Sequence, residues 1–209
     1  MNIKNQQPLL VETAWEVCNQ VGGIYTVLRS KVPAAAERWG NRYLLLGPYM
    51  RTHALAEFEP ATDYNNPIGK TVLSMRQAGY EVHYGYWLIT GRPNVVLFNL
   101  QSVAGQLPKI RFDFWNAHKI PLPEHSDLVN GVMAFGFMAL EFFKRLVMQI
   151  DHQQNPIIAH FHEWMAATPI PDIRRMNMPI KTVFTTHATQ LGRYLCGGDN
   201  RFYQNLPFY

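Results

Sequence analysis

The segment Leu9–Pro48, LLVETAWEVCNQVGGIYTVLRSKVPAAAERWGNRYLLLGP, decides the fold class of this 209-residue chain. It opens with the apolar run Leu9–Ala14, which predicts a strand, and Gly22 and Gly23 then lead into a helical pattern. A glycine and an asparagine end that helix, and the apolar run Tyr43–Leu46 predicts a second strand. A strand, a glycine turn, a helix and a strand form a βαβ unit, in which the strands are parallel and helices cover the sheet.

The rest of the sequence continues this alternation of strands and helices. A long amphipathic helix, capped by Ser126 or Asp127, ends near Ile150, and each of two later strands closes on a histidine. The alternation predicts an α/β fold with a doubly wound, mostly parallel sheet. After the first unit we expect an irregular stretch over 51–69, a helix over 70–77, a strand over 81–88 suited to a hairpin, a strand over 94–100, a loop-rich stretch over 103–124, the long helix, and buried strands over 156–162 and 179–187.

Composition excludes several classes of protein. Hydrophobic residues make up 47% of the chain and charged residues 16%, so the chain has a sizeable core and is not disordered. The net charge of +4 comes without a run of lysines or arginines, which argues against nucleic acid as a partner. The most apolar segment, Leu128–Ile150, contains Glu141, Lys144 and Arg145, so it predicts a buried helix and no membrane span.

Cysteine use and the start of the chain indicate the compartment. Cys18 and Cys196 lie far apart and outside any CxxC motif, which indicates neither a disulfide framework nor a zinc ribbon. The first eight residues are polar and lack the apolar stretch of a secretory signal. We therefore expect a reducing, cytoplasmic setting.

Three clusters fall at the predicted carboxyl ends of strands, where doubly wound sheets bind their ligands. They are Gly22-Gly23, His160–Trp164 and Thr185–Arg193. A glycine pair at the start of a helix suits an anion, because backbone N–H groups are available there. The pair fits neither GxGxxG nor the P-loop, so by itself it is more readily a tight turn without a ligand.

The second cluster offers chemistry through its histidines. His160 and His162 are two residues apart on one strand and therefore share a face. We assign the functional role to His162, because an imidazole can bond a sugar hydroxyl, transfer a proton or bind a metal, and we assign a structural role to His160. Trp164 suits either the wall of a site or the core.

The third cluster combines hydroxyls with one cation. Thr186 and Thr189 can cap the next helix or bond a polyhydroxylated or phosphorylated ligand. Arg193 can bind a phosphate in a bidentate manner or pair with a structural carboxylate. Both alternatives stay open for each residue.

Extended strings in these clusters resemble the eukaryotic-type glycogen synthases from about residue 9 onward, in the same order. The resemblance implies the N-terminal half of a GT-B glycosyltransferase, which has two Rossmann-like domains with the active site between them. The strings that carry it are AWEV over 14–17, VGGIYTV over 21–27, GYEVHYG over 79–85, AHFHEW over 159–164, TTHAT over 185–189 and LGRYLC over 191–196.

The resemblance also implies an activity. Such enzymes transfer glucose, with retention and without a metal or other cofactor, from UDP-glucose or ADP-glucose to the non-reducing end of an α-1,4-glucan. By resemblance residues 1–209 form the acceptor-side domain, and the nucleotide-sugar domain lies C-terminal to it and outside this sequence. That domain of the same enzyme is then a partner, and homo-oligomer formation stays open.

The resemblance assigns roles residue by residue. Gly22 and Gly23 match the glycine turn near the donor phosphates, and His162 matches the histidine that approaches the transferred glucose. Substrate-binding positions are also implied for Glu163, Trp164, Thr186, His187 and Arg193.

Departures from the family pattern keep other functions open. Gln20 stands where the family usually has a basic residue, which removes an expected phosphate contact. A non-catalytic module that binds nucleotide sugar or glucan is therefore the first alternative. The second is a metal-dependent hydrolase that uses His160, His162 and His187. The isolated chain is expected to have little or no transferase activity, because one wall of a cleft cannot exclude water.

Overall fold

The computed structural model describes residues 7–208 and contains one seven-stranded sheet. The strand order is β3-β4-β5-β2-β1-β6-β7, and the five strands β5, β2, β1, β6 and β7 run parallel to one another. Only β4 pairs in antiparallel fashion, with β3 on one side and β5 on the other. The strands are β1 (Leu9–Thr13), β2 (Tyr43–Pro48), β3 (Phe58–Pro60), β4 (Val82–Trp87), β5 (Asn94–Phe98), β6 (Ile157–His162) and β7 (Ile180–Thr185).

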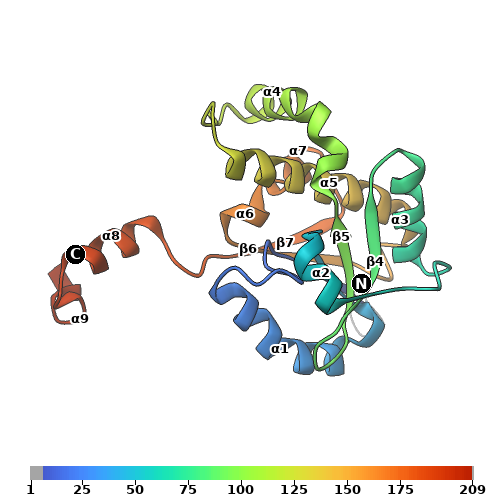
Figure 1. Ribbon diagram of the computed structural model, residues 1–209, viewed down its shortest axis with the longest axis horizontal. Coiled ribbons are helices and arrows are strands. Elements are labelled where there is room, and N and C mark those ends of the chain that lie inside the picture. The colour runs from blue at the N-terminus through green and yellow to red at the C-terminus, as the bar shows by residue number, and fades with distance from the viewer. Residues whose placement is uncertain (1–6, 209) are drawn as a thin grey trace.

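Helices cover both faces of this sheet (Figure 1), so the prediction of a doubly wound, mostly parallel α/β fold is confirmed. The α-helices are α1 (Gly23–Trp39), α2 (Arg51–Glu57), α3 (Pro67–Gln77), α4 (Leu107–His118), α5 (Asp127–Gln149), α6 (Glu163–Ala167), α7 (Ile170–Arg175), α8 (Gln190–Gly198) and α9 (Phe202–Asn205). Short 3-10 turns are η2 (Gly40–Arg42), η3 (Leu100–Gln106) and η4 (Leu206–Phe208).

Alternation along the strands divides the core into two layers. On β2, Leu44 and Leu46 face the layer that α3, α4 and α5 cover, whereas Tyr43 and Leu45 face α1. On β6, Phe161 and its alternate neighbours face the α5 layer. The residues between them therefore face α1, and these include both strand histidines.

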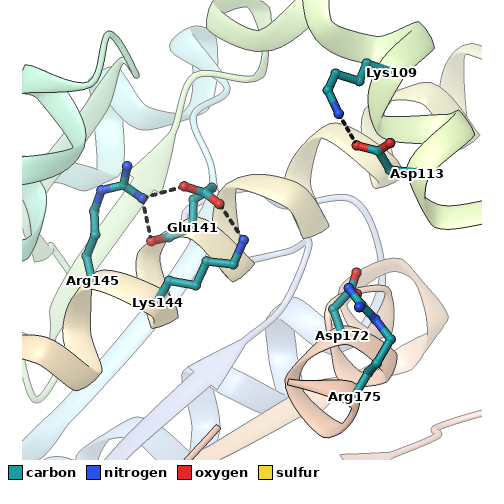
Figure 2. Close-up of polar contacts among 7 residues, drawn as sticks. All are labelled: Lys109, Asp113, Glu141, Lys144, Arg145, Asp172 and Arg175. Carbon is teal, nitrogen blue, oxygen red and sulfur yellow. Dashed lines mark hydrogen bonds and ion pairs between the residues drawn. The ribbon is translucent and has the colours of Figure 1, made fainter. Parts of the chain in front are cut away.

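The long helix α5 shows why an apolar segment with charges belongs in a core. Its cap is Ser126, whose side chain accepts a hydrogen bond from the Val129 N–H. Its charged residues gather on one side, where Glu141 pairs with Lys144 and Arg145 (Figure 2). No helix within residues 7–208 is long and apolar enough to span a bilayer.

Two predicted loop regions are instead structured. The stretch over 51–69 contains α2 and β3, and β3 extends the sheet by pairing with β4. The stretch over 103–124 contains α4, because Pro108 lies in the first turn, where a proline needs no N–H partner. The prolines of these stretches therefore mark helix starts as well as loops.

The C-terminal part departs from the prediction of a buried last strand. β7 lies at the edge of the sheet, and Val183 and Phe184 are about half exposed, at 44% and 51%. Beyond it, α8 and α9 stand away from the body of the molecule (Figure 1). Leu191 and Tyr194 on α8 are correspondingly exposed.

Candidate functional site

The three predicted clusters begin at one edge of the sheet. β1, β6 and β7 are adjacent and parallel, with Thr13 opposite Phe161 and His162 opposite Thr185. Their carboxyl ends therefore lie together, and α1 begins on the side where β6 and β7 end (Figure 1). We take this carboxyl-terminal edge of the sheet, formed by the ends of the strands, as the candidate site.

A buried carboxylate lies beneath this edge. Glu12 is on β1, faces α1 and is 1% exposed. Its Oε2 accepts a hydrogen bond of 2.5 Å from the Tyr43 hydroxyl. Its Oε1 accepts bonds from the Lys31 ammonium and, at 3.1 Å, from His160 Nδ1, and His162 Nε2 lies 3.7 Å away. Burial alone would raise the pKa of Glu12, but these donors together hold it far below its usual value.

The strand histidines connect this carboxylate to the surface. Their rings share a face, as predicted, with centroids 4.2 Å apart. His160 Nε2 meets the Thr185 hydroxyl at 2.8 Å, so His160 bridges β1 and β7, consistent with a structural role. His162 Nδ1 lies 3.1 Å from Nε2 of His187, whose ring stacks nearly parallel to that of His162.

His162 itself is buried, at 2% exposure, and the exposed histidine of this pair is His187. Burial lowers the pKa of His162, although the nearby Glu12 acts in the opposite direction. The neutral ring is therefore favoured at neutral pH. Direct contact of His162 with a ligand requires the side chains that bury it to move.

Glu163 joins two of the clusters. It directly follows β6, with a left-handed backbone at φ of 60°. Its Oε1 accepts bonds from the His187 N–H, from the Ala188 N–H at 2.9 Å and from the Thr186 hydroxyl at 3.3 Å. Burial would raise the pKa of Glu163, but the two backbone N–H groups outweigh it and lower the pKa. In this structure Glu163 holds the loop that presents His187, and substrate contact by Glu163 or Thr186 stays a prediction.

The glycine turn differs from the expectation of free N–H groups. The Gly22 N–H donates to Glu16 Oε2 at 2.7 Å, and the Tyr25 N–H donates to the same oxygen at 3.0 Å. Glu16 thus satisfies the start of α1 as an anion would. A Cβ on Gly22 would lie 3.3 Å from Glu16, whereas one on Gly23 would meet nothing within 4 Å.

The remaining predicted residues lie at the periphery of the site. Trp164, on α6, is 48% exposed and so available as a wall. Arg193 is on α8, which stands away from the strand ends (Figure 1), so the structure does not bring it to His162. Thr189 caps α8 by accepting from the Gly192 N–H at 2.9 Å. Its capping role is therefore confirmed.

The structure gives a different set of candidate metal ligands from the predicted His160, His162 and His187. Among the described residues, ligand atoms of Glu12, His160 and His162 lie within 4.8 Å of one another, and His187 is not part of this group. The Lys31 ammonium already bonds Glu12 Oε1, so a cation placed there would face another cation. The donor set therefore favours a hydrogen-bonded network.

A cavity of about 420 Å³ adjoins the same edge of the sheet. It lies beyond the ends of β1, β2 and β5, and its lining includes Trp15, Tyr49, Asn99 and Asn130. A larger cavity, of about 530 Å³, opens at the amino ends of the strands, beside Leu9 and elements preceding β6. Of these two cavities, the smaller one lies at the carboxyl ends of the strands.

Sequence reasoning missed Glu12, Lys31, Tyr43 and Glu16. The sequence held one signal for Glu12: a glutamate within the apolar strand LLVET needs hydrogen-bond or ionic partners once it is buried. Those partners come from α1, β2 and β6, so no local pattern identifies them.

The fold is an α/β domain in which the candidate site lies at the carboxyl ends of parallel strands. The family model described as glycogen synthase matches residues 12–209, and the chain belongs to the glycogen synthase family. The Rossmann-like sheet that the resemblance implied is confirmed.

Characterised relatives are glycogen synthases. The chain is 42% identical to the liver glycogen [starch] synthase of Mus musculus over 198 residues, covering 95% of this chain and 28% of that protein. It is 42% identical to glycogen [starch] synthase isoform 1 of Saccharomyces cerevisiae, covering 98% and 30%. It is 39% identical to the glycogen [starch] synthase of Neurospora crassa, covering 99% and 29%. The chain thus spans under a third of each relative.

Proposed function

We propose that this chain is the N-terminal, acceptor-side part of a retaining glucosyltransferase of the glycogen synthase type. The whole enzyme transfers glucose from UDP-glucose or ADP-glucose to the non-reducing end of an α-1,4-glucan in the cytoplasm. A C-terminal domain outside this sequence supplies the second wall of the cleft. Family membership over residues 12–209 supports the proposal most directly.

The geometry of the strand ends suits this chemistry. Glycosyl transfer needs charges and dipoles that are already in place around a cationic sugar and a departing diphosphate. The hydrogen bonds around Glu12 and those that Glu163 accepts from the loop at His187 hold His162 and His187 at the carboxyl ends of the strands before any ligand binds. The adjoining cavity, with Trp15 and Tyr49 in its lining, is a suitable place for part of the glucan chain.

The proposal is tested with a chimera. Residues 12–209 replace the matching segment of the Saccharomyces cerevisiae relative, and glucose incorporation from UDP-glucose into a maltooligosaccharide is measured. We expect activity in the chimera and little or none in the isolated chain. A folded chimera that transfers no glucose would contradict the proposal, and elongation by the isolated chain would contradict the need for a second wall.

A matched pair of variants locates the activity. His162→Gln in the chimera is expected to lower kcat strongly. His152→Gln changes an exposed histidine that precedes β6, at the opposite end of the strand, and should leave kcat unchanged. Equal effects of both changes would speak against a site at the carboxyl ends.

One observation favours a binding module as the second candidate. Glu16 occupies the N–H groups of the glycine turn, and the exposed Gln20 offers no positive charge to a diphosphate. Calorimetric titration separates the candidates. Maltooligosaccharide binding without any transfer by the chimera supports the module, whereas transfer supports the enzyme.

A further inference from the structure

The Glu12 carboxylate, the buried His162 and the exposed His187 form a series that runs from the core to the surface. Glu12 Oε1 lies 3.7 Å from His162 Nε2, and His162 Nδ1 lies 3.1 Å from His187 Nε2. Among residues 7–208 no hydrogen bond or ion pair joins Glu12 directly to His187, so the path of contacts between them passes through His162. We name these three residues the Glu12–His162–His187 series.

We propose that Glu12 is a positioning residue that sets, through His162, which ring nitrogen of His187 carries the proton. The inference concerns the placement of protons and adds a residue that the family resemblance did not assign. Its use in catalysis rests on the proposed function, whereas the proton placement does not.

The first step is the protonation of Glu12. Three donors from three neighbouring elements point at its two oxygens, and they hold the carboxylate in its ionised form. An ionised carboxylate has no proton to give, so every polar contact that it makes needs a donor. His160 therefore carries a proton on Nδ1, and its Nε2 accepts from the Thr185 hydroxyl.

The second step is the proton of His162. A bare Nε2 would aim a lone pair at the Glu12 oxygen, so Nε2 carries the proton. This nitrogen is buried and has no partner within hydrogen-bond distance, since Lys31 and His160 already crowd the oxygen that it faces. Burial keeps the ring neutral, because it lowers the pKa of His162. Nδ1 of His162 is then an acceptor.

The third step is the effect of the His162 proton on the placement of the proton in His187. Because His162 Nδ1 accepts, His187 Nε2 must donate across their 3.1 Å contact. With its Nε2 donating, a His187 ring that carries a single proton has a bare Nδ1, and His187 is exposed at the strand ends. A bare ring nitrogen is an acceptor for a hydroxyl proton. Under the proposed function, the hydroxyl it receives belongs to the sugar.

Ring-nitrogen NMR on the ¹⁵N-histidine-labelled 209-residue chain tests the proton placement without any substrate. At pH 7.5 we expect His162 protonated at Nε2 and bare at Nδ1, His187 protonated at Nε2, and His160 protonated at Nδ1. A bare Nε2 on His162 overturns the proposal. This measurement needs no variant, so it holds even where a substitution prevents folding.

Two variants test the coupling. Glu12→Gln removes the charge and should move the ring-nitrogen signals of both His162 and His187. Tyr43→Phe removes one donor to Glu12 but keeps its charge, so the His187 signals should stay in place. Unchanged His187 signals in a folded Glu12→Gln variant overturn the proposal, because a merely structural glutamate would leave them unchanged.

Activity of the chimera separates this inference from the proposed function. Glu12→Gln should lower kcat by about tenfold with little change in KM, as expected for a misplaced catalytic contact. If the ring protons lie as stated and the chimera is inactive, the proposed function fails while the positioning of His187 stands. If the chimera is active and the ring protons lie otherwise, the positioning fails alone.

Discussion

Tyr43→Phe removes a single hydroxyl from the buried network beneath the candidate site. Tyr43 is fully buried, and its hydroxyl donates to Glu12 Oε2 at 2.5 Å. No other donor to this oxygen is present among residues 7–208. The phenylalanine keeps the ring packing, so the variant isolates the bond to the carboxylate.

The magnitude follows from the charge and burial of the acceptor. A hydrogen bond to a charged group contributes about 1.5–3 kcal/mol, and the upper part applies because water has little access to Glu12. We expect the free energy of unfolding to fall by about 2–3 kcal/mol. For a chain of this size, the corresponding fall in Tm is about 4–12 °C.

The assay is urea unfolding of the 209-residue chain at pH 7, with Tyr25→Phe as the matched control. The Tyr25 hydroxyl donates to Glu57 Oε1 at 2.6 Å, but Glu57 is only half-buried and Trp87 Nε1 donates to its other oxygen. Its loss should be about 1 kcal/mol. An equal or larger loss at Tyr25, or a loss below about 0.5 kcal/mol at Tyr43, would refute the reasoning.

Three further outcomes follow from the same contacts. Folding lowers the pKa of Glu12, so as the pH falls the unfolded state takes up this proton before the folded state does. The free energy of unfolding should therefore decline below about pH 5. In urea unfolding measured between pH 7 and 3, Glu12→Gln should show a smaller decline. Gly22→Ala forces Glu16 to shift and should cost about 1 kcal/mol, whereas Gly23→Ala, which meets open space, should cost nothing; equal losses would contradict the assigned contact. Ser126→Ala removes the cap of α5 and should cost about 1 kcal/mol, restored by Ser126→Asp and absent if the cap is unimportant.

Local patterns predict the elements whose signals are local. The run over 9–48 predicts the first βαβ unit, and Ser126 predicts the start of α5, because strand length, glycine turns and caps depend on neighbouring residues. The shared face of His160 and His162 follows from the two-residue period of a strand. These features needed no knowledge of the distant partners.

The features that sequence reasoning missed depend on distant partners. β3 exists because it pairs with β4, and Glu12 can be buried because Lys31, Tyr43 and His160 supply donors from other elements. The bond from Gly22 to Glu16 joins residues only six apart, but it depends on how the loop after β1 folds, which no motif in the sequence indicates. The sequence identified the motif residues, but it did not predict that His162 is buried and that His187 is the exposed histidine.

The most direct test of the central claim is an amide NMR titration of the 209-residue chain with UDP-glucose and, separately, with maltotetraose. We predict that signal changes concentrate at the carboxyl ends of the strands, at Trp15, Gly22, Thr186 and His187. Changes confined to the cavity at the opposite edge, around Asn94 and Asn155, would contradict the placement of the site.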